Sequence, residues 1–125
     1  MQVSKDIFLH NIIPYISYFE LDEFLIILCF KEDEIAAIVN KEYARRLKCV
    51  ISEWHTKYTV DKLRHREDGP AIIWADGLQL WYQKDKLHRL DGPAVIHKNG
   101  FQEYYVNNTQ QRVDFVSVID LYETV

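Results

Sequence analysis

The sequence predicts an α+β protein, in which a small N-terminal helical bundle (residues 1–51) precedes an antiparallel β-meander of tandem hairpin repeats (residues 52–125). Two observations predict this fold class. Apolar residues recur at helical spacing before Ser52 and alternate with a period of two after it. The second half also aligns with itself, without a gap, at an offset of 23 residues.

Caps, acidic helix starts and one proline divide the first half into helical pieces. The expected pieces are residues 4–15 with Ser4 as N-cap and a kink at Pro14, 20–30 with an apolar stripe of Phe24, Leu25, Leu28 and Cys29, 32–39 with Ile35, Ile38 and Val39, and 41–50, with an interruption at Asn40. These short amphipathic pieces predict a compact bundle.

The repeat in the second half is defined by the motif His-Arg-x-Asp-Gly-Pro-Ala. His65-Arg66 falls on His88-Arg89, and Asp68-Gly69-Pro70-Ala71 falls on Asp91-Gly92-Pro93-Ala94. The copies span about residues 65–87 and 88–110, and a worn third copy begins at Gln111, since Arg112 and Asp114 keep the offset. Residues 52–58 are expected to form a preceding strand. Residues 115–122 could form a final strand or a short helix.

Each copy predicts a hairpin with a two-residue type I′ turn, at Asp76-Gly77 and at Asn99-Gly100. This register pairs Trp74 with Gln79 and sorts the side chains onto two faces. One face would be structural, with Ala71, Ile73, Leu78, Leu80 and Tyr82 in the first copy. The other carries Ile72, Trp74, Gln79 and Trp81, repeated as Val95, His97, Gln102 and Tyr104. Either the helical half covers the second face, or Trp74, Trp81, His97 and Tyr104 form an exposed binding patch.

The sequence contains no pattern that indicates catalysis. The net charge of −4 argues against a nucleic-acid partner, and the apolar run 24–30 is too short to span a membrane. Two cysteines and a polar start at residues 1–6 favour an intracellular protein with free thiols. The motif histidines His65 and His88 occur once per copy, so we expect a turn role, with the neighbouring arginine pairing an aspartate or a carbonyl, rather than a metal site.

Other charged side chains have simple structural explanations. Lys41, Arg45, Arg46 and Lys48 are expected to form a solvated helix face. The sequence thus predicts no catalytic residue, no metal and no cofactor, and we expect the chain not to be an enzyme.

Two resemblances to known families add expectations. The motif and its aromatic hairpin, over about residues 58–114, resemble MORN-like repeats in uncharacterised proteins of large DNA viruses and phages. Residues 33–47, Asp-Glu-Ile-Ala-Ala-Ile-Val-Asn-Lys-Glu-Tyr-Ala-Arg-Arg-Leu, look like the second half of an F-box, with residues 21–30 as its first helix. The usual Leu-Pro opening is replaced by Leu21-Asp22.

The resemblance implies a non-enzymatic adaptor for protein–protein interaction. The helical half would dock on a Skp-type subunit of a host ubiquitin ligase through Leu25, Leu28, Ile35, Ile38 and Val39, and the repeats would hold a target. The alternative is a structural minor virion component or an inhibitor of a host defence protein. Either function implies the host cytoplasm or the virion. The open sheet also leaves homodimerisation through an edge strand as an alternative to a monomer.

Overall fold

The computed structural model describes residues 10–114 and combines helices with an antiparallel sheet, as the sequence predicts. The chain divides into two compact units between Arg46 and Leu47. Residues 115–122, expected as a strand or a helix, and Ser4, expected as an N-cap, lie outside the described residues.

The first unit consists of short helices. Residues 10–12 are helical, and they are followed by the 3-10 turns η1 (Ile13–Tyr15) and η2 (Tyr18–Glu20) and the helices α2 (Leu21–Ile27) and α3 (Glu32–Arg46). Pro14 lies in the first turn of η1, where its missing N–H costs nothing. Ile13, Leu21 and Leu25 are buried, and Phe24, Ile35, Ile38 and Val39 pack against them.

One helix replaces two that the sequence predicts. Asn40 does not interrupt α3, whose first turn is acidic and whose last turn carries Arg45 and Arg46, the charges that a helix dipole favours. The last expected piece, residues 41–50, is wrong in its second half. Leu47–Ile51 forms the strand β1, which pairs with β2 through contacts such as Cys49 opposite Tyr58. Long-range pairing of a β-branched stretch therefore outweighs the helical pattern.

Arg46 is also buried, contrary to the solvated role expected for it. Its guanidinium donates to the carbonyls of Ile13 (2.7 Å) and Ile16 (2.6 Å) and pairs with the buried Glu42. Arg45 donates two hydrogen bonds to the same carboxylate. The hydrogen bond from Arg45 is the main reason that the pKa of Glu42 is lowered. This network ties η1 to the end of α3.

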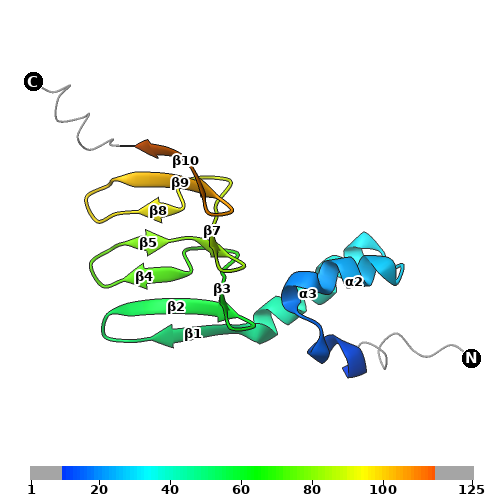
Figure 1. Ribbon diagram of the computed structural model, residues 1–125. Helices are drawn as coiled ribbons and strands as arrows, with labels where there is room; N and C mark the ends of the chain where they lie inside the picture. The colour runs from blue at the N-terminus through cyan, green and yellow to red at the C-terminus, as the bar shows by residue number, and fades with distance from the viewer. Residues whose placement is uncertain (1–9, 115–125) are drawn as a thin grey trace, which may run out of the picture. The chain divides into compact units, whose positions relative to one another are not determined.

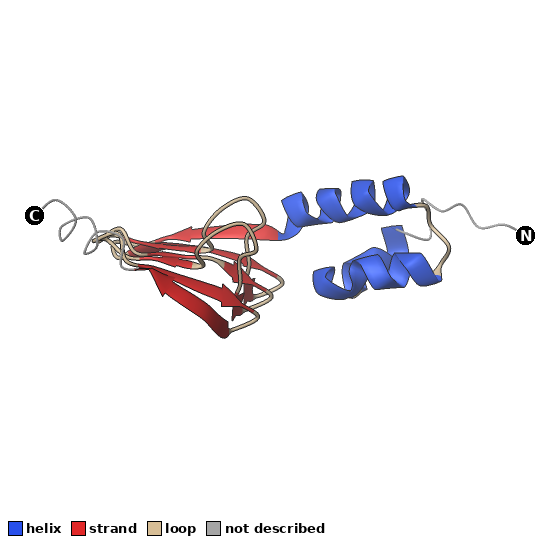
Figure 2. Ribbon diagram, turned by 90° about the horizontal axis from the view of Figure 1, so that it is seen from above, coloured by secondary structure: helices blue, strands red, loops and turns tan. Residues whose placement is uncertain are grey.

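The second unit is a stack of hairpins (Figure 1). Its strands are β1 (Leu47–Ile51), β2 (His55–Val60), β3 (Leu63–Arg64), β4 (Ile72–Trp74), β5 (Gln79–Leu80), β6 (Tyr82–Gln83), β7 (Lys86–Leu87), β8 (Val95–Ile96), β9 (Gln102–Val106) and β10 (Thr109–Asp114). Within residues 10–114 the main sheet runs β1-β2-β4-β5-β8-β9-β10, with β3 on β2, and β6 pairs with β7. Seen from above, the hairpins lie over one another (Figure 2).

The 23-residue period governs this stack, and it begins earlier than the motif suggests. We define copy 1 as residues 47–69, copy 2 as 70–92 and copy 3 as 93–114. Strands β1, β4 and β8 occupy the same place in successive copies, as do β2, the pair β5 and β6, and β9. The worn third copy therefore takes part in the stack, and the strand expected at 52–58 is the second strand of a further copy.

The hairpin register differs by one residue from the one expected. Ile73 lies opposite Gln79 and Ile72 opposite Leu80, because the loop has three residues that end on Gly77 with a positive φ of 100°. The second copy repeats this, with Ile96 opposite Gln102 and Gly100 at φ 89°.

A slip of one residue exchanges the faces. The expected structural and binding faces are therefore wrong: Ile72 shares a face with Leu80, and Ile73 shares the opposite face with Gln79. The most buried repeat residues are Val60, Ala71, Ile72, Ala94 and Val95.

Type I′ geometry does occur, at sites that the sequence analysis missed. Asp61-Lys62, Lys84-Asp85 and Asn107-Asn108 each have two consecutive positive φ values between 47° and 70°. They recur every 23 residues and close the short hairpins at the other end of each copy. Their signal in the sequence is the recurrence itself, since none of them contains glycine.

Candidate interaction surfaces

Each motif turn is built around an arginine that lies flat between an aromatic ring and a glycine. The Arg66 guanidinium lies 4.0 Å from the ring centroid of Tyr58 and donates to Asp68 Oδ1 (3.1 Å) and to the carbonyl of Pro70 (3.2 Å). A Cβ on Gly69 would lie 3.0 Å from Arg66 Cζ. The motif needs glycine here because the guanidinium fills the space of a side chain.

The same arrangement recurs twice at the repeat offset. Arg89 lies 4.2 Å from the ring centroid of Trp81 and donates to Asp91 Oδ1 (3.0 Å) and to the Pro93 carbonyl (3.1 Å). Arg112 lies 4.1 Å from the Tyr104 centroid and pairs with Asp114 at 3.4 Å. The pairing expected for the motif arginines, with an aspartate or a carbonyl, is thus confirmed. We call Arg66, Arg89 and Arg112 with their rings the arginine ladder.

The motif histidines join one part of the repeat to the next type I′ turn. His65 is buried, accepts a hydrogen bond from the Lys84 N–H at Nδ1 (3.0 Å), and contacts Glu67 Oε1 through Nε2 (2.7 Å). His88 accepts from the Asn107 N–H in the equivalent way (3.1 Å). The structural role expected for both histidines is confirmed.

A second ion pair links neighbouring copies. Arg64 pairs with Asp85, whose carboxylate also accepts from the Arg64 N–H, and the Arg64 guanidinium lies over the Tyr82 ring. The hydrogen bond from Arg64 lowers the pKa of Asp85, and the one to Asp85 raises the pKa of Arg64. Asn108 replaces the aspartate in the next copy, where its Oδ1 accepts from the Leu87 N–H (2.7 Å).

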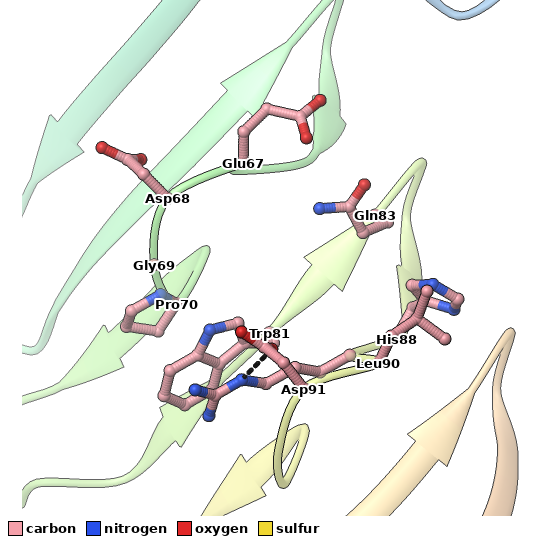
Figure 3. Close-up of a pocket in the computed structure, with 10 residues that line it drawn as sticks. Glu67, Asp68, Gly69, Pro70, Trp81, Gln83, His88, Leu90 and Asp91 are labelled. Atoms are coloured by element: carbon pink, nitrogen blue, oxygen red, sulfur yellow. Dashed lines mark hydrogen bonds and ion pairs between the residues drawn. The ribbon is translucent and has the colours of Figure 1, made fainter.

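Shallow cavities lie between successive motif turns. One has a volume of about 500 Å³ and is lined by the turn 67–70, by Trp81 and by the turn 88–91 (Figure 3). The next, of about 530 Å³, lies one repeat further along and is lined by the turn 89–92, by Tyr104 and by Arg112. Leu90, on the rim of both, is 81% exposed.

The four candidate binding residues of the repeats fall into two separate pairs. Trp81 and Tyr104 lie beneath the ladder arginines and line these cavities. Trp74 stacks on His55 at 4.9 Å near the hairpin loops. His97 takes the equivalent place one copy later and pairs with Glu103 at 2.7 Å. A single patch of all four, which the expected register implied, does not form.

The helical candidates also separate. Leu25 is fully buried, and Ile35 and Ile38 pack against the helical core, so among these four only Leu28 is substantially exposed, at 37%. The adjacent Ile26 and Ile27 are 60% and 76% exposed. We call Ile26, Ile27 and Leu28 the α2 patch. Sequence reasoning missed Ile26 and Ile27 because the run 24–30 is apolar throughout and gives no face a distinct pattern.

A second apolar surface that the sequence analysis missed lies at the first strand of the stack. Val50, Ile51 and Trp54 are 54%, 77% and 66% exposed. The misassigned helix hid this surface, because it placed Val50 on a buried side.

Comparisons and general searches give little further identification. No three His, Cys, Asp or Glu side chains lie close enough to hold a metal ion within residues 10–114, and no helix in that range is long and apolar enough to cross a membrane. No protein-family model matches the sequence, and neither the curated proteins nor the solved structures yield a match.

Proposed function

We propose that the chain is a non-enzymatic interaction protein, an F-box-like adaptor whose helical unit binds a Skp-type subunit and whose MORN-like repeats hold a second protein. The observation that supports it most is the α2 patch. Three consecutive apolar residues are exposed in a small unit that already has its own buried core. Contiguous exposed apolar surface of this kind marks protein-binding sites.

The docking residues differ from those the resemblance implied. Leu25, Ile35 and Ile38 serve the helical core, so Ile26, Ile27 and Leu28 carry the contact in this proposal. Large apolar side chains that become fully desolvated dominate the binding energy of such contacts.

The repeat unit suits the second role because its copies present the same cavity twice. Each cavity combines an aromatic ring, a guanidinium and a carboxylate beside the exposed Leu90. Aromatic and arginine side chains are the commonest anchors of protein interfaces. Rigid turns hold these groups, so binding a target would order few side chains.

The test is a direct titration of the full chain with a purified Skp-type subunit. We expect saturable binding that Ile27→Glu weakens at least tenfold, because the variant places a charge in the contact. Tyr15→Glu, at another highly exposed apolar position of the same unit, is the matched control and should bind like the wild type. Absence of binding by the folded wild-type chain would refute the adaptor proposal and favour a structural virion component or an inhibitor of host defence.

A further inference from the structure

The two edges of the stacked sheet differ in chemistry. The edge strand β10 carries Thr109-Gln110-Gln111-Arg112, and these four residues are exposed and polar. The opposite edge strand, β1, reads Leu-Lys-Cys-Val-Ile, and its last four residues are exposed. Polar and charged edges discourage strand addition, whereas apolar edges invite it.

The repeat itself shows what is missing at β1. Cys49 occupies the place that Ile72 and Val95 hold in the next two copies, and it is exposed while they are 7% and 5% exposed. Strands β4 and β8 have a paired strand on both sides, whereas β1 pairs with β2 alone among the described residues. In a stacked array the terminal unit needs a cap to cover this position.

Hydrogen-bond direction along β1 shows which groups are available. The Ser52 N–H donates to the His55 carbonyl (2.9 Å), and alternation in an antiparallel pair then directs residues 50 and 48 to β2 as well. The N–H and C=O groups of Leu47, Cys49 and Ile51 consequently face the free edge.

These features are self-complementary. When two β1 strands meet antiparallel about a two-fold axis at Cys49, Leu47 lies opposite Ile51 of the second copy and Lys48 lies opposite Val50. The outward groups of residues 47, 49 and 51 then pair with one another, and the two Lys48 side chains are not directly opposed. A head-to-tail contact would instead place the polar β10 against β1.

We propose that β1 is a dimerisation strand, through which two copies of this chain join their sheets edge to edge with Cys49 at the two-fold axis. This surface is distinct from the α2 patch, so the dimer and the proposed adaptor function can fail independently. The occupant of the β1 edge is a second copy, because the register satisfies the outward backbone groups of both strands at once.

Sedimentation of the full chain over a range of concentrations tests the proposal. We expect a reversible dimer that becomes monomeric in Ile51→Lys, which puts a charge on the edge, and in Cys49→Pro, which removes an N–H that faces away from β2. Thr109→Lys on β10 is the matched control and should remain dimeric. A monomeric wild type, or a dimer that only Thr109→Lys disrupts, would overturn the proposal.

Cross-linking locates the contact independently. Opposed residues of a hydrogen-bonded antiparallel pair have Cα atoms about 5.5 Å apart, within the range of a disulfide. Oxidation with diamide, which accepts the two thiol hydrogens, should therefore link Cys49 to its copy in a Cys29→Ser chain and should fail after Ile51→Lys. Links that form through Cys29 in a Cys49→Ser chain at equal yield would place the contact elsewhere and contradict the proposal.

Discussion

Replacing Gly92 by alanine tests whether the ladder arginines explain the motif glycine. The new Cβ would lie 2.9 Å from Arg89 Cζ and 3.2 Å from its Nε, so the guanidinium must leave its place over Trp81. The φ of Gly92 is not positive, and the cost therefore comes from this contact rather than from backbone strain.

The magnitude follows from the contacts that Arg89 would lose. The cation–π contact with Trp81 contributes about 1 kcal/mol, and the hydrogen bond to the Pro93 carbonyl contributes about 1 kcal/mol. The pair with the exposed Asp91 contributes about 0.5 kcal/mol. We expect Gly92→Ala to lower the free energy of unfolding by about 2 kcal/mol, after a gain of roughly 0.5 kcal/mol from the less flexible unfolded chain.

A double-mutant cycle in urea isolates this coupling. All three tryptophans of the chain lie in the repeat unit, so their fluorescence reports the unfolding of that unit. In an Arg89→Ala background, Gly92→Ala should cost nothing, and the coupling energy should be about 2 kcal/mol. An equal cost in both backgrounds would refute the explanation, because the glycine would then be needed for a reason unrelated to Arg89.

Three further predictions concern buried polar groups. Arg46→Ala should destabilise the helical unit by about 3 kcal/mol in far-UV circular dichroism melts, since it leaves a buried carboxylate unpaired, whereas Arg45→Ala, at a 54% exposed side chain, should cost about 1 kcal/mol or less. Because the folded pKa of Glu42 is lowered, its contribution is present above its unfolded pKa and disappears as the pH falls through the folded value; melts from pH 7 to pH 3 should show this loss in the wild type and not in Glu42→Gln. His65→Leu should cost about 2 kcal/mol in urea melts followed by tryptophan fluorescence, because it strands the Lys84 N–H, and a loss below about 0.5 kcal/mol would contradict that role.

The sequence was most informative where identical residues recur. The offset of 23 residues identified the motif turn, the pairing of its arginines and the third copy at Arg112, because side-chain identity and spacing determine these contacts. It misjudged the hairpin register, since Asp76-Gly77 suits a two-residue turn as well as the three-residue loop that forms. The choice between them depends on pairing with neighbouring copies, which local residues do not encode.

The strand β1 was missed for a related reason. Residues 47–51 continue the apolar spacing of α3, and only their place beneath β2 makes them a strand. Aligning Cys49, Val50 and Ile51 with Ile72, Ile73 and Trp74 would have revealed it. The exposure of Ile27 and the burial of Leu25 likewise depend on how the helices pack, which a uniformly apolar stretch does not specify.

The central claim is that three copies stack, each with an arginine held over the ring of the preceding hairpin. NMR spectra of the arginine Nε–Hε groups test it most directly. The account predicts that Arg66, Arg89 and Arg112 all show ring-shifted signals, and that Tyr58→Leu, Trp81→Leu and Tyr104→Leu each abolish one shift, at the arginine eight residues later. Shifts confined to Arg66 and Arg89, or a loss at a different arginine, would contradict the three-copy stack.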